Sequence, residues 1–206
     1  MRHFKVLMTL FSVILFSGFS VFAKTSSPQS ESKSEGKKGG RVSIETSYLA
    51  GGCFWGMEDL LRKIPGVTDV TVGYMGGNVK NATYNIVKLG ASGHAETVKI
   101  DFDPAKLKYE DLLLNFFKMH DPTTENRQGN DVGTQYRSEI FYTSEEQKAT
   151  AEKVRARVDK SGAWGKPVVT KIEKAGEFWK AEDYHQDYLV KNPGGYTCHY
   201  IRPLTF

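Results

Sequence analysis

Alternation of apolar and polar residues predicts three strands in the first half of the chain. The residues that share a parity within each strand are Ile44, Tyr48 and Ala50, then Val70, Val72 and Tyr74, then Val98, Ile100 and Phe102. Between the first two strands, apolar residues at positions 57, 60, 61 and 64 follow the spacing of one helical face, which ends at Pro65-Gly66. Cys53 therefore stands where the first strand passes into a helix N-terminus, and Glu96 lies on the apolar side of the third strand.

Helices and strands also alternate in the second half, around a long polar stretch. Helical patterns cover 109–118 and a segment from Ser144 to about Lys160, where Ser144 and Gln147 form a capping box and Gly162 is the expected stop. Residues 140–142 and 167–172 are predicted to be strands, 180–190 a short helix and 192–206 a coil. Residues 121–137 show no periodicity, and a loop of this length in a compact domain is usually functional. The order of elements favours the α+β class: a two-layer α/β sandwich with a mixed sheet, a ferredoxin-like core and a long coil at the C-terminus.

The first 41 residues are predicted to lie outside the folded domain. Residues 1–23 combine Arg2 and Lys5 with an apolar run and Ala23, the form of a signal peptide cut after Ala23; an uncleaved membrane anchor is the alternative. Residues 24–41 contain no Ala, Val, Ile, Leu, Met, Phe, Trp, Tyr or Cys and are predicted to be a disordered linker. The remaining segment, 42–206, is predicted to be one domain outside the cytoplasm, either periplasmic or secreted.

The basic charge of the chain is concentrated in those first two segments. The whole chain carries +4, of which residues 1–23 supply +2 and residues 24–41 supply +3, so the domain itself carries −1. The domain therefore has no basic footprint for nucleic acid. The whole chain is 39% apolar and 12% aromatic, which is typical of a globular protein. The domain of residues 42–206 is long enough to form a core without disulfides.

Cys53 and Glu96 are the first candidates for chemistry. A helix N-terminus favours a thiolate and the two preceding glycines let a substrate approach, so Cys53 is a candidate nucleophile. A structural disulfide between Cys53 and Cys198 is the alternative. Glu96 is a candidate acid with a raised pKa, because a carboxyl on the apolar side of a strand is costly to ionise; a partly wetted glutamate at the sheet edge is the alternative.

Five further residues are weaker candidates when each is taken alone. Phe54 and Trp55 follow Cys53 and are candidate walls of an apolar pocket, with ordinary core packing as the alternative; we expect one of them to face the site. Tyr84 and Tyr136 are phenol donors in turn or loop contexts, and Asp131 lies in the long polar stretch. Each of these last three is compatible with a purely structural role.

Several blocks of the sequence, in this order, resemble one family. The blocks are Gly51-Gly52-Cys53-Phe54-Trp55-Gly56, Gly73-Tyr74-Met75-Gly76-Gly77, Gly93-His94-Ala95-Glu96, His120-Asp121-Pro122-Thr123-Thr124, Asn126-Arg127-Gln128-Gly129, Asp131-Val132-Gly133-Thr134-Gln135-Tyr136-Arg137-Ser138 and Tyr184-His185-Gln186-Asp187-Tyr188. They are similar to the signature blocks of peptide methionine sulfoxide reductase A, over residues 46–200. Ala82 and Lys88-Leu89-Gly90 depart from the pattern of many members without removing a proposed catalytic group.

The resemblance implies thiol-dependent reduction of methionine S-sulfoxide, free and in oxidised proteins, without a cofactor. Cys53 would attack the sulfoxide sulfur and Glu96 would protonate its oxygen, which Tyr84 and Tyr136 would hydrogen-bond. The substrate-binding residues implied by the resemblance are Phe54 and Trp55 for the methyl group and Asp131 near the substrate backbone.

The resemblance also implies how the protein is recycled. Cys198 matches the resolving cysteine of many members, so it would condense with a sulfenic acid on Cys53 to form a disulfide. A thioredoxin-like partner would then reduce that disulfide. The other expectations are a role in repair of oxidised proteins, a monomer, no nucleic-acid partner, and a membrane contact only if the signal segment stays uncleaved.

Three other functions are open on the residues alone. Cys53 with His185 or His199 would make a cysteine hydrolase dyad. The same two histidines with the two cysteines would make a structural zinc site, but the close-paired ligand spacing of such sites is missing. A secreted binding domain with one structural disulfide is the third alternative. His94 and His120 are expected to be structural in every case.

Overall fold

The computed structural model of the protein describes residues 43–206. The signal peptide predicted for 1–23 and the linker predicted for 24–41 lie outside the described residues. The elements are β1 (Glu45–Gly51), α1 (Phe54–Arg62), β2 (Val67–Met75), α2 (Tyr84–Val87), β3 (Ala95–Phe102), α3 (Tyr109–Met119), β4 (Arg127–Gln128), β5 (Asp131–Val132), the 3-10 helix η1 (Thr134–Tyr136), β6 (Ser138–Tyr142), α4 (Glu145–Ser161), β7 (Lys171–Lys174), β8 (Trp179–Lys180) and α5 (Tyr188–Lys191).

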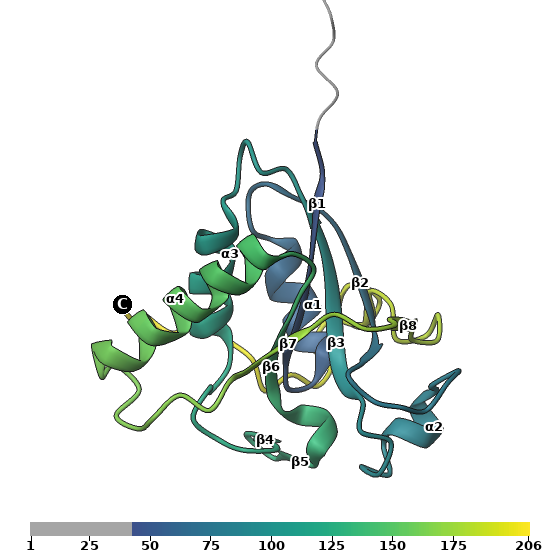
Figure 1. The fold of residues 1–206 in the computed structure, drawn as a ribbon. Helices are drawn as coiled ribbons and strands as arrows, with labels where there is room; N and C mark the ends of the chain where they lie inside the picture. Colours follow the sequence, from purple (N-terminus) through teal and green to yellow (C-terminus); the bar gives the residue numbers. More distant parts are fainter. Residues whose placement is uncertain (1–42) are drawn as a thin grey trace, which may run out of the picture. The chain divides into compact units, whose positions relative to one another are not determined.

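The main sheet of the described region is mixed. Its strand order is β7-β6-β1-β3-β2-β8, and every neighbouring pair is antiparallel except β6 with β7. The units β1-α1-β2 and β3-α3-β6 interleave, with β3 between β1 and β2 and with β1 between β3 and β6 (Figure 1). This interleaving is the ferredoxin-like arrangement. The predicted α+β sandwich with a mixed sheet is therefore confirmed.

The main hydrophobic core lies between one face of this sheet and helices α1, α3 and α4. The even-numbered apolar residues predicted for β2 and β3 belong to it, as the sequence pattern indicated. In β1, however, Leu49 belongs to this core, whereas Tyr48 and Ala50 belong to a smaller cluster with Met75 and Phe141. The strand predicted here is confirmed, and Tyr48 and Ala50 share one face as the alternation indicated, but Leu49 on the opposite face is buried as well.

Helix α4 begins and ends as its sequence predicts. The Ser144 side chain accepts a hydrogen bond from the Gln147 backbone N–H, which satisfies one of the free amides of the first turn. Gly162 follows the last helical residue with φ 65°, the left-handed conformation that favours glycine at this position. The second bond of the capping box is shifted by one residue, because the Gln147 side chain accepts from the Thr143 N–H rather than from that of Ser144. The predicted start and stop of α4 are confirmed.

The helix predicted at 180–190 is wrong, and only Tyr188–Lys191 are helical there. Several of the preceding residues form hydrogen bonds with other elements. The Ala181 N–H donates to the Val72 carbonyl, and the Gln186 side chain bonds both the N–H and the carbonyl of Val72. Asp187 has φ 56°, and its N–H donates to the Glu58 carboxylate. These bonds to β2 and α1 replace the intrahelical ladder.

The strand predicted at 167–172 is displaced toward the C-terminus, since β7 begins only at Lys171. The Val169 N–H donates to the Pro122 carbonyl, so this part of the segment pairs with a loop before it joins β6. None of the helices in residues 43–206 combines the length and the apolar character needed to cross a membrane.

Candidate active site

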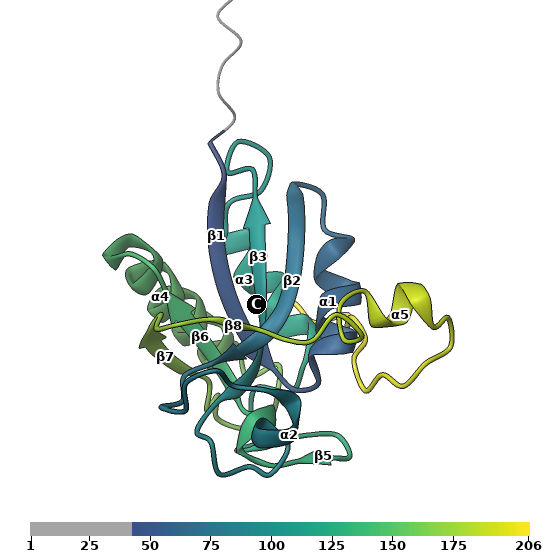
Figure 2. The same ribbon diagram turned by 90° about the vertical axis from the view of Figure 1, so that its right-hand side faces the viewer.

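A cavity of about 190 Å³ lies where β1 ends and β3 begins. Its lining residues are Cys53, Phe54, Trp55, Tyr84, Glu96, Asp131, Tyr136 and Tyr196. The short elements α2 and β5, which contribute Tyr84 and Asp131, lie beyond this end of the sheet (Figure 2). Seven residues singled out in the sequence therefore meet in one place, although they are spread over more than eighty positions.

Cys53 is the residue immediately before α1, as predicted. Gly52 has φ +104°, and a Cβ there would lie 2.3 Å from Gln128 Cγ, so the turn before Cys53 requires glycine. Cys53 itself is only 7% exposed. Burial, and then the nearby Glu96 carboxyl, raise the pKa of the thiol well above its ordinary value, although the Trp55 N–H acts in the opposite direction. The helix N-terminus is thus outweighed, and free Cys53 is a thiol rather than the thiolate that its position suggested.

Glu96 lies beside the start of α1, where the Phe54 N–H donates to Glu96 Oε2 over 3.0 Å. Glu96 is only 4% exposed, so the alternative of a partly wetted glutamate at the sheet edge is wrong. Burial raises the pKa of Glu96 to about 8, against the ordinary 4.5, despite that N–H bond. At neutral pH the carboxyl is mostly protonated and able to donate a proton inside the cavity.

Two phenols share the cavity with Cys53 and Glu96. Burial, and then the Glu96 charge, raise the pKa of Tyr84 and of Tyr136, so both remain hydrogen-bond donors. Glu182 positions Tyr84, because one of its carboxylate oxygens accepts from the Tyr84 N–H over 2.9 Å and the other from the Tyr74 hydroxyl over 3.0 Å. No sequence pattern indicated this role for Glu182.

Phe54 and Trp55 both line the cavity, whereas their adjacency in the sequence had indicated that only one of them would face it. Phe54 is also fully buried in the main core. Trp55 stacks on Tyr188 with ring centroids 3.6 Å apart, and its indole N–H donates to His185 Nδ1 over 3.0 Å. His185 therefore supports the aromatic wall, a role that sequence reasoning missed because it considered this histidine only as a catalytic base or a metal ligand.

Asp131 connects the cavity to the C-terminal coil. Its Oδ1 accepts from the Tyr196 hydroxyl over 3.1 Å, and its Oδ2 lies 3.4 Å from Cys198 Sγ, which donates to it. Burial and this bond to Asp131 raise the pKa of Cys198 to about 11. Cys53 and Cys198 are both free thiols in this structure, which therefore does not contain the structural disulfide considered as an alternative. Tyr196 was also missed, because nothing in the local sequence places the coil against Asp131.

The histidines proposed for the other functions have different neighbours. His185 bonds Trp55, and His199 contacts the Gly51 carbonyl and Cys198. Neither histidine forms a hydrogen bond with Cys53 within the described part of the chain. Across residues 43–206, no three His, Cys, Asp or Glu side chains are grouped so that they could hold a metal ion.

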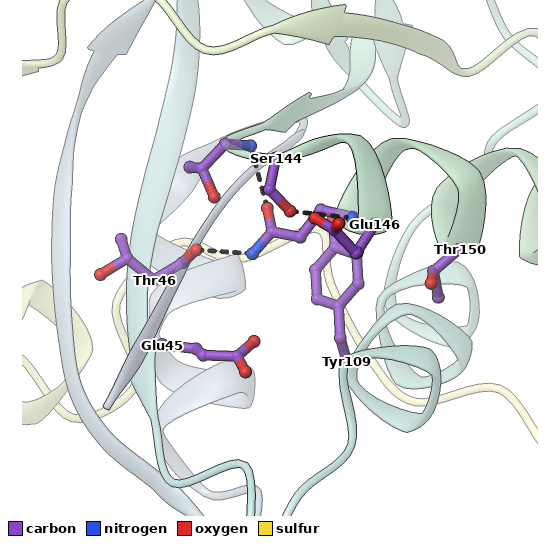
Figure 3. Close-up of a pocket in the computed structure, with 8 residues that line it drawn as sticks. Glu45, Thr46, Tyr109, Ser144, Glu146 and Thr150 are labelled. Carbon is purple, nitrogen blue, oxygen red and sulfur yellow. Dashed lines mark hydrogen bonds between the residues drawn. The ribbon is translucent and has the colours of Figure 1, made fainter. Parts of the chain in front are cut away.

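A second cavity, of about 460 Å³, lies near the start of β1 (Figure 3). Its lining residues are Glu45, Thr46, Tyr109, Thr143, Ser144, Glu146, Gln147 and Thr150. Two of its hydroxyls have structural tasks, since that of Ser144 caps α4 and that of Thr46 donates to Asp101 Oδ1 over 2.6 Å. This larger cavity has no thiol, so we place the candidate chemistry in the smaller one.

Comparison with known proteins agrees with this assignment. The sequence profile described as "Peptide methionine sulfoxide reductase" matches residues 45–205. The chain belongs to this family. It is therefore an oxidoreductase of the peptide methionine sulfoxide reductase type.

Relatives and solved structures cover most of the reductase. It is 58% identical to "Peptide methionine sulfoxide reductase MsrA 1" of Mesorhizobium japonicum over 79% of this chain and 92% of that protein. It is similar to Mxr1 of Saccharomyces cerevisiae in reduced form, with a TM-score of 0.73 and 38% identity over 77% of this chain and 92% of that chain. It is also similar to Mxr1 in complex with Trx2, with a TM-score of 0.53 and 25% identity over 77% and 90% of the two chains.

Gly56, in the first turn of α1, tests how closely the C-terminal coil must pack on the reductase site. A Cβ at Gly56 would lie 2.4 Å from Thr197 Oγ1 and 2.7 Å from His199 Nδ1. We expect Gly56→Ala to displace the coil and to slow disulfide formation by about 10²-fold, because misplacement by about 1 Å can cost that much. Methionine formation in the first turnover should be retained.

The measurement is single-turnover methionine release beside loss of free thiols. Gly176→Ala is the matched control, since a Cβ there meets nothing within 4 Å. Disulfide formation at the parental rate in Gly56→Ala would show that the coil does not have to sit as the structure places it.

Proposed function

We propose that this protein reduces methionine S-sulfoxide, both free and in oxidised proteins, with Cys53 as the nucleophile and Glu96 as the acid. The observation that carries the proposal is the shared cavity, in which a buried thiol and a mostly neutral buried carboxyl face the same space. A thiol alone fits many reactions. A proton donor that stays neutral beside it suits a substrate whose oxygen must be protonated while sulfur is attacked.

In the first step Glu96 gives its proton to the sulfoxide oxygen, and Tyr84 and Tyr136 hydrogen-bond the same oxygen. The Cys53 sulfur attacks the sulfoxide sulfur, and its own proton passes to the Glu96 carboxylate. The oxygen then moves to Cys53, leaving methionine and a sulfenic acid. Phe54 and Trp55 enclose the methyl group, and Asp131 binds near the substrate backbone.

The second step restores Cys53. The Cys198 thiol condenses with the sulfenic acid, so that a disulfide and one water molecule form. A thioredoxin-like dithiol then reduces the disulfide by exchange and is itself oxidised. The solved complex of Mxr1 with Trx2 supports a partner of this class. The Cys198 thiol lies close to the cavity, because it donates a hydrogen bond to Asp131, which lines the cavity.

We also propose that the domain acts outside the cytoplasm and as a monomer. The proposal of export rests on the signal-peptide form of residues 1–23. Mass determination of the N-terminus in separated cell fractions tests it, with a chain that begins at Lys24 as the expected product. A full-length chain in the cytoplasmic fraction would contradict export.

The deciding experiment is reduction of racemic methionine sulfoxide by the purified protein with dithiothreitol. Consumption should stop near one half, with the R epimer left over, as chiral chromatography would detect. Consumption of both epimers would contradict the S preference. No consumption by a folded and reduced protein would contradict the proposed reaction as a whole.

A further inference from the structure

His199 is held in one tautomer beside the Cys198 thiol. Its Nε2 lies 2.8 Å from the Gly51 carbonyl oxygen, which can only accept a hydrogen bond, so Nε2 carries the ring proton. The opposite nitrogen, Nδ1, therefore has a free lone pair, and it lies 3.5 Å from Cys198 Sγ. A base and a thiol thus face each other in a fixed orientation.

The imidazole of His199 also packs directly on the turn that bears Cys53. A Cβ at Gly52 would lie 3.1 Å from His199 Nε2, and a Cβ at Gly56 would lie 2.7 Å from His199 Nδ1. The two glycines on either side of Cys53 therefore leave the space that the ring fills. With 6% exposure, His199 is fixed between Cys198 and the Cys53 turn rather than free to swing into solvent.

We propose that His199 is the general base of the resolving step, which takes the proton of Cys198 as this thiol attacks Cys53. The proposal rests on the function proposed above. His199 Nδ1 accepts the Cys198 proton while a bond forms between the two sulfurs and the S–O bond of the Cys53 sulfenic acid breaks. The imidazolium then returns the proton to the departing hydroxide, so that the products are a disulfide, one water molecule and neutral His199. The Cys53 sulfur is reduced and the Cys198 sulfur is oxidised.

The state of the imidazole suits this role. Burial lowers the pKa of His199, with Arg202 acting in the same direction and the Gly51 bond and Asp131 opposing it. The ring is therefore neutral at neutral pH and Nδ1 is free to accept a proton. The thiol needs such help, because the pKa of Cys198 is raised to about 11 and little thiolate forms spontaneously.

Asp131 Oδ2 is the competing acceptor, at 3.4 Å from Cys198 Sγ. His199 Nδ1 has no hydrogen-bond partner other than this thiol in the described part of the chain. Asp131, by contrast, also accepts a hydrogen bond from the Tyr196 hydroxyl. The arrangement therefore favours His199 as the base, with Asp131 orienting the thiol.

The variant His199→Gln tests the basic Nδ1 of His199 separately from the hydrogen bond between this residue and the Gly51 carbonyl. The glutamine amide N–H can still donate to the Gly51 carbonyl, but the side chain has no basic nitrogen opposite Cys198. The measurement is a reductant-free single turnover with one equivalent of methionine sulfoxide, in which methionine, free thiols and dimedone-trapped sulfenic acid are quantified over time. We expect unchanged methionine release, disulfide formation slowed by about 10²-fold and accumulation of sulfenic acid.

The pH dependence distinguishes a lost base from a displaced coil. Without the base, only spontaneous thiolate reacts, so the disulfide rate of His199→Gln should rise about tenfold per pH unit between about pH 7 and 9.5 and approach the parental rate. A coil that is merely displaced would keep the same deficit at every pH, and that result would overturn the proposal. Disulfide formation at the parental rate at neutral pH would overturn it as well.

His94→Gln is the matched control, since His94 is another buried histidine whose two ring nitrogens bond the backbone, at Gly77 and Val79. It should leave the disulfide rate unchanged. If the parental protein releases no methionine at all, the proposed function fails, and this outcome differs from any failure of the His199 proposal.

Discussion

Cys53→Ser is expected to abolish methionine formation even in the first turnover, whereas Cys198→Ser should release about one methionine per protein molecule and then stop. The serine hydroxyl is a far weaker nucleophile than sulfur and cannot carry the transferred oxygen, so the loss in Cys53→Ser should reach about 10⁴-fold or more. In Cys198→Ser the first step is intact, but the sulfenic acid on Cys53 has no internal thiol with which to condense.

Methionine released per protein molecule, without reductant, is the quantity to measure. Each variant controls for the other, because both replace a sulfur by an oxygen at a site next to Asp131 or Glu96. Thermal unfolding checks that the buried Cys53 site still folds after the change. Equal loss of the first turnover in both variants would contradict the assignment of nucleophile and resolving thiol.

Elements with one buried face could be predicted from the sequence because burial then leaves a periodic signal. In β3 buried Val98, Ile100 and Phe102 alternate with the more exposed Lys99 and Asp101. Extending this parity to Glu96 was enough to predict that its carboxyl is buried. In β1 the alternation identified the strand but not the face that meets the main core, because Leu49 and Ala50 are both fully buried on opposite faces. Periodicity does not tell which face of such a strand packs on the helices.

The site was predictable only in part, because several of its contacts join distant segments. Asp131 and Tyr196 are separated by 65 positions, and Trp55 and His185 by 130. No local pattern indicates such pairs. The roles of Tyr84, Tyr136 and Asp131 in the site were inferred from the family resemblance rather than from periodicity. The protonation of Cys53 was missed for a related reason. The sequence shows that a helix begins there, but it does not show how deeply the thiol is buried.

Glu96→Gln should cost activity and increase stability at the same time. Glutamine keeps an oxygen that can accept the Phe54 N–H but has no acidic proton, so methionine release should slow by about 10²- to 10⁴-fold. In the parental protein the first-turnover rate should also fall above about pH 8, as the Glu96 carboxyl loses the proton that it must donate.

The gain in stability follows from the raised pKa of Glu96. Between its ordinary value of 4.5 and its folded value of about 8, the folded protein binds a proton that the unfolded chain has released. The free energy of unfolding therefore falls as pH rises through this window. Glutamine removes this penalty, so the variant's advantage should be absent near pH 4, grow with pH, reach at most about 3 kcal/mol at pH 7 and level off above about pH 8.

Urea unfolding of the two proteins at several pH values measures this difference directly. Glu173→Gln, a change at an exposed glutamate on β7, is the control and should show no advantage that grows with pH. An advantage of Glu96→Gln that stayed constant from pH 4 to 8 would mean that the carboxyl ionises normally in the folded protein. Glu96 would then hold no proton at neutral pH, and the acid of the reaction would have to be one of the two phenols.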